Sequence, residues 1–343
     1  MMAANRREGR NVMDLALTSL TFLAAAFLAG VMGFAIQRGA TCTVAAVNEV
    51  LEKRRFRRLL AMVEASVWVA GGLLIAQSLH LLRDMPAGYP VTGLTVLGAV
   101  LLGLGAAVNG ACVFGAVARL GSGQWAYALT PVGFYVGCAT VHAVFSPPVF
   151  QRLAYGSFVL RAPGWIPLAF IAFALWRLGR PMIEVVHEGR QAGLHRMLVQ
   201  RVWEPHAATT VIGIAFFFML LLVGSWAYTD VLAELARSMM AASLLARGML
   251  LAFLLLGAVM GGWSAGLLRS TRISVRSLLA CFVGGMLMGW GSLLIPGGND
   301  GLILVGMPLL WPYAWVAFAT MCVSIGCAML AQKALMHAAV LGG

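Results

Sequence analysis

The chain has 343 residues, of which 61% are hydrophobic and only 10% are charged, and its mean hydropathy is +0.89. These values exclude an ordinary soluble domain. At about 20 residues per membrane-spanning helix, the length allows roughly nine or ten spans and leaves no room for a separate soluble domain. The net charge of +12 does not indicate nucleic-acid binding, because the basic residues form short clusters between apolar runs, as cytoplasmic loops do.

Apolar runs predict the helices in chain order. The first, at about 13–32, follows three arginines and resembles a secretory signal. Its apolar run continues to residue 36, however, and we interpret it as a retained helix. A broken, non-helical stretch is predicted at about 33–50. Further helices are predicted at about 58–82, 92–108, from 113, 124–145, 164–178, 207–228, 247–268 and 313–336, with a broken pair around Gly298.

Two glycine-rich breaks, at 109–112 and 296–301, lie at matched positions inside apolar stretches. Shifting the chain by 186 positions (298 − 112 = 186) superposes the two breaks and much of their surroundings. The shift places Gly98, Leu101, Gly103, Gly105, Gly115, Trp125, Tyr127 and Ala128 on Gly284, Leu287, Gly289, Gly291, Gly301, Trp311, Tyr313 and Ala314.

Backbone that leaves helical geometry inside lipid must face protein or a water-filled cavity. Matched breaks in two halves are typical of the midplane binding site of a transporter. We therefore predict an all-α integral membrane protein with two pseudo-symmetric, inverted-repeat-like halves, whose re-entrant broken helices meet at the bilayer midplane. The whole chain, 1–343, forms one transmembrane domain, with a first half at about 11–176, a cytoplasmic linker at about 177–205 and a second half at about 206–343.

The basic clusters predict the orientation. Those at 6–10, 53–58, 177–201 and 269–276 should all be cytoplasmic, and with them the N-terminus. Residues 33–50 must then return to the side that they left, which requires a re-entrant or second crossing element there. The turn at Arg83 and Asp84 and the segment 230–247 should face outward, and the linker is expected to carry an amphipathic surface helix.

The stretch 33–42 is the first candidate site and contains Gln37, Arg38 and Cys42. Polar side chains are costly in apolar surroundings, so Gln37 and Arg38 should face protein, water or a ligand. The planar guanidinium of Arg38 suits an oxyanion. Alternatively, Arg38 extends to the cytoplasmic interface and Gln37 bonds a carbonyl that the break has freed.

Asn109, Gly110 and Cys112 form the second candidate, in the first matched break. A thiol at a helix N-terminus lies among exposed backbone N–H groups, which favour an anion or a thiolate. The alternative is that Cys112 is a small apolar packing residue. The other cysteines lie within uninterrupted helical runs and should be packing residues. No Cys or His spacing fits a metal site, and no cofactor is expected.

Gly297, Gly298, Asn299 and Asp300 form the third candidate, in the second matched break. An ionisable residue at membrane depth is a functional candidate, so Asp300 could carry a proton or a cation, or act as a gate. It could equally cap the half-helix that follows, and we favour capping because a carboxylate aimed at an anion would repel it.

The motif that runs from Gly33 to Cys42, the Gly-x-Cys break at Cys112 and the glycine-rich second break resemble the YeeE/YedE family of bacterial sulfur transporters, whose best-understood members take up thiosulfate. The resemblance implies that three cysteines pass thiosulfate along through S–H hydrogen bonds. Cys42 and Cys112 match the first two. Gly298-Asn299 stands where the family has cysteine-asparagine, so Asn299 could donate its amide N–H instead.

The sequence thus predicts an inner-membrane importer of thiosulfate or a related small sulfur-containing anion, not an enzyme, with a path along Cys42, Cys112 and residues 297–300. The resemblance also implies a cytoplasmic sulfurtransferase partner of the TusA type. Two alternatives remain. One is a membrane thiol-redox protein that uses Cys42 and Cys112, which requires the two thiols to approach within disulfide range. The other is a non-transporting subunit that docks a sulfur-carrier protein.

Overall fold

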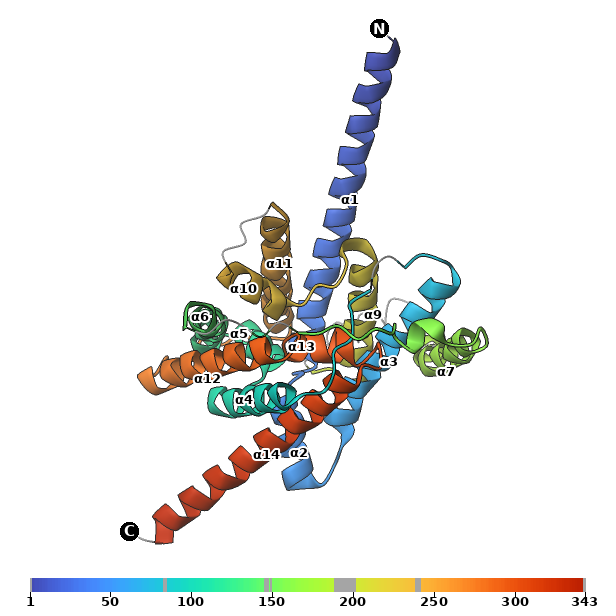
Figure 1. Cartoon of the computed structure of the whole chain (residues 1–343). Helices are drawn as coiled ribbons and strands as arrows, with labels where there is room; N and C mark the ends of the chain where they lie inside the picture. The colour runs from blue at the N-terminus through green and yellow to red at the C-terminus, as the bar shows by residue number, and fades with distance from the viewer. Residues whose placement is uncertain are drawn as a thin grey trace.

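The computed structural model describes residues 2–82, 85–144, 148, 150–187, 202–237 and 242–341, and every regular element in this part is helical. The predicted turn at Arg83 and Asp84 lies outside the described residues, and so do residues 188–201, about half of the linker in which a surface helix is predicted. The helices are α1 (Met2–Arg38), α2 (Thr43–Lys53), α3 (Arg57–Ser78), α4 (Gly93–Asn109), α5 (Val113–Gly121), η1 (Trp125–Ala128), α6 (Leu129–Val144), η2 (Val159–Arg161), α7 (Ile166–His187), α9 (Pro205–Val223), α10 (Tyr228–Ala236), α11 (Ala242–Ser264), α12 (Val275–Leu294), α13 (Asn299–Gly301), the π-helical η3 (Leu302–Gly306) and α14 (Pro312–Leu341) (Figure 1).

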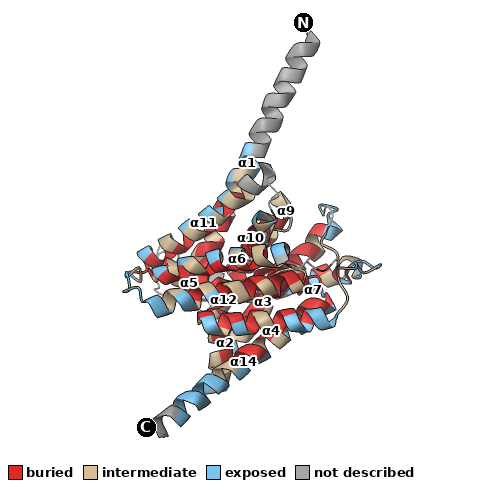
Figure 2. Ribbon diagram, turned by 60° about the vertical axis from the view of Figure 1, so that its left-hand side comes forward, coloured by how far each residue is buried: buried red, intermediate tan, exposed pale blue. Residues whose placement is uncertain are grey.

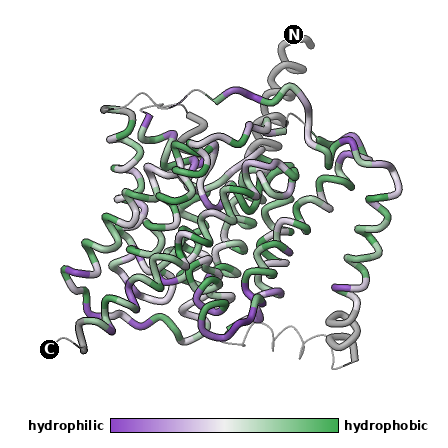
Figure 3. The backbone as a smooth tube through the Cα atoms, turned by 60° about the horizontal axis from the view of Figure 1, so that its bottom comes forward, coloured by the Kyte–Doolittle hydropathy of each residue, from purple (hydrophilic) through white to green (hydrophobic). Residues whose placement is uncertain are grey.

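Seven helical segments in the described part of the chain are long and apolar enough to cross a membrane. Buried residues concentrate in the middle of the bundle (Figure 2), while large apolar side chains such as Phe27, Leu175 and Trp263 are exposed on its outside. Hydrophilic segments lie mostly at helix ends and in connections (Figure 3). An apolar exterior over a packed interior is the arrangement of a protein that lies in lipid.

The prediction that 33–50 is non-helical is wrong for most of this stretch. Helix α1 continues through Arg38, and the break is confined to residues 39–42, where Ala40 has a positive φ of 44°. Gly33 does not interrupt the helix, because its missing side chain admits the backbone of Leu254 on α11. Glycine here allows two helices to pack closely. Helix α10 is additional to the predicted helices, and α2 begins in the stretch where a re-entrant or second crossing element is predicted.

Close glycine contacts also fix the relative directions of the helices. Gly30 meets Gly257, and Gly261 meets Gln37, so α1 and α11 run in the same direction. The start of α1 and the basic segment 269–276 after α11 therefore lie on opposite sides. The two predictions that placed both segments in the cytoplasm are incompatible.

Helices α4 and α12 cross through two glycine pairs. Gly98 packs on Gly291, and Gly105 packs on Gly284, with each backbone occupying the space that a side chain would need. These two helices therefore run antiparallel. They lead directly to the two breaks, because α4 ends at Asn109 and α12 ends at Leu294.

Candidate functional site

The thiols of Cys42 and Cys112 are neighbours at the start of two short helices. Cys42 occupies the N-cap position of α2, and Cys112 occupies that of α5. The backbone N–H of Thr43 donates to Cys112 Sγ at 3.1 Å, and Cys42 Sγ fills the space beside Gly115. Both thiols are free and buried. The first N–H groups of two helices thus surround a pair of weak S–H donors.

Asn109 and Gly110 hold the first break in shape. Gly110 ends α4 in the left-handed conformation, with φ of 72°, which glycine adopts without steric cost. Asn109 Nδ2 donates to the carbonyl of Ala111 at 2.7 Å, and its Oδ1 accepts from Thr130 Oγ1 at 2.9 Å. Since both ends of its amide have partners within the protein, Asn109 stabilises the turn.

The second break brings Asp300 against the first turn of α10. Gly297 has φ of 118°, and Gly298 is the N-cap of α13. Asp300 accepts from the Thr229 hydroxyl and, at 3.2 Å, from the Thr229 backbone N–H. The N-cap of α13 is Gly298 and no side chain caps that helix, so Asp300 does not occupy the capping position predicted for it. Its carboxylate accepts from an N–H at the start of α10, a neighbouring segment.

The side-chain amide of Asn299 is buried and has no hydrogen-bond partner among the described residues. Its side chain is 1% exposed, and neither its amide oxygen nor its amide nitrogen has a partner in the described part of the chain. An unsatisfied buried polar group costs about 1–3 kcal/mol. Native proteins rarely retain such a group without a reason, and a ligand is one such reason.

The start of α10 connects the two breaks. The Tyr228 hydroxyl donates to the carbonyl of Val113 at 2.9 Å, directly after Cys112, while Thr229 holds Asp300. Helix α13 packs against both α5 and α10, near the middle of the bundle (Figure 1). The structure thus brings the candidate residues of the two breaks and Cys42 into one region.

Gln37 and Arg38 lie beside this region, where α1 meets α5 and α11. Gln37 Nε2 donates to Ser122 Oγ at 3.2 Å, and its buried Oε1 has no partner among the described residues. Arg38 is fully buried, donates to Ser264 Oγ at 2.9 Å and stacks on Phe34. Neighbouring helices thus enclose the guanidinium of Arg38, at the end of α1.

Two cavities approach the region. One of about 320 Å³ is lined by Thr229, Asp230, Arg237 and residues of the second break, Gly297 and Gly298 among them. A smaller one, of about 10 Å³, is lined by Cys42, Arg58 and Thr209 among others. The larger lies by the turn between α9 and α10, and the smaller lies by the turn between α1 and α2. The thiols and Asn299 therefore lie in the packed region of the bundle that both cavities approach.

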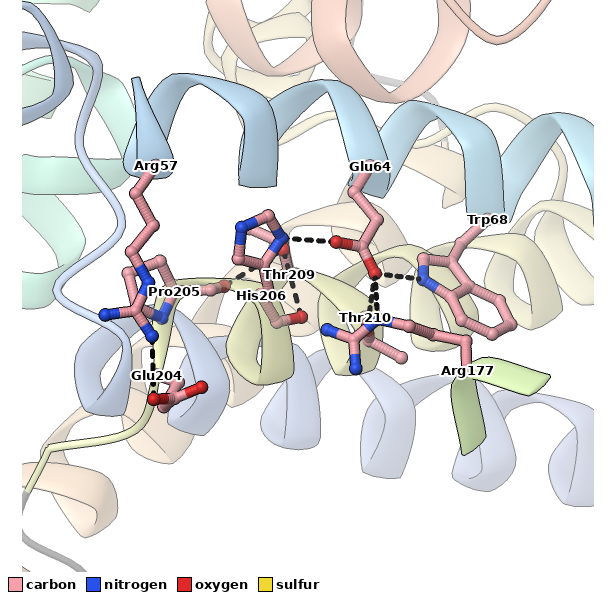
Figure 4. A network of polar contacts seen from close by, with 9 residues as sticks. All are labelled: Arg57, Glu64, Trp68, Arg177, Glu204, Pro205, His206, Thr209 and Thr210. Atoms are coloured by element: carbon pink, nitrogen blue, oxygen red, sulfur yellow. Dashed lines mark hydrogen bonds and ion pairs between the residues drawn. The ribbon is translucent and has the colours of Figure 1, made fainter. Parts of the chain in front are cut away.

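A separate polar cluster joins three helices away from the breaks. Glu64 on α3 accepts from Arg177 Nε at 3.0 Å, from Thr210 Oγ1 and Trp68 Nε1 at 3.3 Å each, and contacts His206 Nδ1 (Figure 4). These contacts account for a carboxylate inside a membrane-spanning segment. We interpret the cluster as a clamp that holds α7 and α9 on α3.

The four remaining cysteines lie within helices, as predicted. Cys138 is fully buried on α6, with its thiol 3.6 Å from the carbonyl of Gly289. Cys281 is buried on α12, and Cys322 and Cys327 become progressively more exposed along α14. None lies at a break.

Residue types alone did not reveal Thr43, Tyr228 and Thr229. The repeat contained a signal for them, because the same shift of 186 positions places Cys42 on Tyr228 and Thr43 on Thr229. At both positions the backbone N–H of the threonine donates to a side chain of a break, from Thr43 to Cys112 and from Thr229 to Asp300.

A helical bundle with membrane-length apolar helices and two polar breaks in its interior defines a multi-pass membrane protein. The family model described as sulphur transport matches residues 38–329, and the chain belongs to this family, the YeeE/YedE sulfur transporters. It is similar to the thiosulfate transporter TsuA of Escherichia coli (strain K12), with 23% identity over 320 residues, which cover 86% of this chain and 90% of the relative.

Proposed function

We propose that this chain imports thiosulfate or a closely related small sulfur-containing anion across the bacterial inner membrane. The observation that carries the proposal is the buried amide of Asn299, which has no partner in the described structure. It lies on α13, which packs against α5, the helix that begins at the free thiol of Cys112. A ligand that passes this region would find S–H, amide and backbone N–H donors. Membership of a sulphur transport family and similarity to a thiosulfate transporter support this substrate class.

The donors suit conduction rather than tight binding. A thiol is a weak donor that can hydrogen-bond a soft sulfur anion without trapping it, and a conducting path needs binding that is weak enough to release the ion. The N-termini of α2 and α5 add a partial positive field. The path of this proposal runs from the larger cavity, past residues 297–300 and the two thiols, to the smaller cavity at Cys42.

The two halves are, on this proposal, inverted repeats about an axis in the membrane plane, joined by the linker at about 177–205. A shift of 186 converts the contact of Gly98 with Gly291 into that of Gly284 with Gly105, and both contacts are present. Similarly, α1 packs on α11 while their counterparts α9 and α3 pack together. Broken helices α4–α5 and α12–α13 then meet in a shared site, as in other transporters with this symmetry.

The face that carries residues 53–58 and 269–276 is the more basic, and we place it in the cytoplasm. A chain of contacts connects the two segments on this face. Arg57 pairs with Glu204, and the backbone N–H of the neighbouring Trp203 donates to the Arg38 carbonyl. The Arg38 side chain in turn donates to Ser264, at the end of α11. The N-terminus then starts on the opposite side, contrary to the sequence-based expectation. A sulfur carrier of the TusA type would dock on the basic face.

Uptake of ³⁵S-thiosulfate into proteoliposomes tests the function. We expect saturable uptake that unlabelled thiosulfate and other small anions with terminal sulfur reduce, and that chloride does not. Uptake no greater than in protein-free vesicles, with the protein folded and inserted in both orientations, would overturn the proposal.

The closeness of the two thiols favours one second candidate, a thiol-redox protein that passes reducing equivalents through a Cys42–Cys112 disulfide. The transport proposal predicts that mild oxidation which joins these thiols blocks uptake and that reduction restores it. The redox candidate predicts instead that electrons cross vesicles in the absence of any sulfur anion, and that Cys42→Ala stops them.

A further inference from the structure

One basic side chain, Arg119, points back toward the first break. It lies on α5, about two turns after Cys112, in a segment apolar enough to span the membrane. Side chains on a helix lean toward its N-terminus. Accordingly, Arg119 Nη1 lies 3.7 Å from where a side-chain carbon on Gly110 would stand, and it contacts the Tyr127 hydroxyl.

The partners of Arg119 are all uncharged. Its guanidinium lies over the Tyr127 ring, 5.0 Å from the centroid, and the Tyr127 hydroxyl donates to the Asn109 carbonyl at 3.2 Å. No carboxylate pairs with it in the described part of the chain. By contrast, other half-buried arginines do have such partners, Arg177 with Glu64 and Arg247 with Glu234.

A guanidinium without a counter-ion in a membrane segment is costly and is a functional candidate by default. The second break has no counterpart of this arginine, because the shift of 186 places uncharged Val305 at the position that matches Arg119. The second break carries Asp300 instead. An arginine therefore lies by the first break, and an aspartate lies in the second.

We propose that Arg119 is the counter-charge that holds the transported anion beside Cys42 and Cys112, with Tyr127 positioning its guanidinium. This inference rests on the proposed function. The guanidinium has five donors in a planar fork, of which the phenol engages one, so donors remain to bond the terminal oxygens or sulfur of a thiosulfate-like anion. The selectivity of the site for charge would then come from Arg119.

The test is the kinetics of uptake for Arg119→Gln and Arg119→Lys, with Arg276→Gln as the matched control. Arg276 is exposed at the start of α12, away from both breaks. Two substrates are compared, the thiosulfate dianion and the methanethiosulfonate monoanion, which keeps the terminal sulfur and loses one charge. Gel filtration and the thermal unfolding midpoint establish that each variant is folded.

Arg119→Gln should raise the KM for thiosulfate about tenfold or more, the usual effect of losing one charged hydrogen bond. The KM for the monoanion should rise clearly less. Arg119→Lys should keep the preference for the dianion with a smaller rise in KM, and the control should match the wild type. If Arg119→Gln prevents folding, the ratio of the KM values for the two anions in the Arg119→Lys variant decides the question.

Equal effects of Arg119→Gln on the two anions, or none, would overturn the inference and leave Arg119 as a brace for the first break. Loss of the dianion preference in a folded Arg119→Lys variant would overturn it as well. Failure of the proposed function is distinguishable, because the wild type would then transport neither anion.

Discussion

A methyl group added at Gly115 should displace the Cys42 thiol. An alanine side chain there would stand 2.9 Å from Cys42 Cβ and 3.1 Å from Ala111 Cβ, and closer still to Cys42 Sγ. Overpacking of this kind costs about 1–3 kcal/mol. Because Gly115 lies inside α5, alanine also stabilises the helix by about 1 kcal/mol through its higher helix propensity. Gly115→Ala should therefore destabilise the protein by only about 0–2 kcal/mol.

Uptake should respond far more than stability. If Cys42 donates to the anion, moving its thiol should lower uptake of labelled thiosulfate at least about tenfold, as a shift of about 1 Å does at other precise sites. Cys42→Ala should lower it as much. In the double variant Cys42→Ala/Gly115→Ala the sulfur is absent, so stability should partly recover while uptake stays low.

The thermal unfolding midpoint and proteoliposome uptake measure the two effects separately. Gly301→Ala is the matched control for stability, because Gly301 occupies the same repeat position and has nothing within 4 Å of an added side-chain carbon. Normal uptake by Cys42→Ala, or recovery of uptake in the double variant, would refute the reasoning, since the loss in Gly115→Ala would then arise from packing alone.

Three further variants separate binding from structure. Asn299→Leu should leave stability unchanged or raise it by about 1 kcal/mol, because it removes an unsatisfied buried amide, and should lower uptake at least about tenfold; normal uptake would exclude Asn299 from the path. Asp300→Asn should keep substantial uptake and its pH dependence, because the amide oxygen can accept from the Thr229 N–H while the amide NH2 donates to the Thr229 hydroxyl; complete loss in a folded variant would make Asp300 the coupling residue. Glu64→Ala should lower stability by about 2 kcal/mol, as loss of charged hydrogen bonds does, without changing the KM for thiosulfate; a changed KM would connect the Glu64 cluster to transport.

Most of the long helices could be predicted from hydropathy, because a run of about 20 apolar residues has the length that a helix needs to cross a bilayer. The two short helices could not. Helix α2 has 11 residues and α10 has nine, and each carries charges, so neither gives a hydropathy signal. The sequence also does not reveal the role of Gly33, which lets the backbone of Leu254 pack against α1. In sequence, a glycine of this kind cannot be distinguished from one that breaks a helix.

The site was predictable to the level of the breaks and not beyond. Cys112 and Gly298 were identified because they superpose under the repeat. The side chains of Cys112 and Asp300 each accept a bond from a backbone N–H, of Thr43 and Thr229 respectively. Every residue other than proline carries such a group, so residue type does not indicate these donors. The partner of Asp300 lies 71 positions away in sequence, and only tertiary structure shows that its carboxylate serves α10.

The two breaks share one backbone arrangement but differ in chemistry. At each break a threonine N–H at the start of a short helix donates to a side chain of the break, but the acceptor is the sulfur of Cys112 at the first and the carboxylate of Asp300 at the second. The difference follows from Gly298, which has no side chain and whose space the Thr229 hydroxyl takes. A carboxylate already neutralises part of the N-terminal field of α10. The field on the thiol side remains available to an anion, so under the proposed function sulfur specificity belongs to the first half alone.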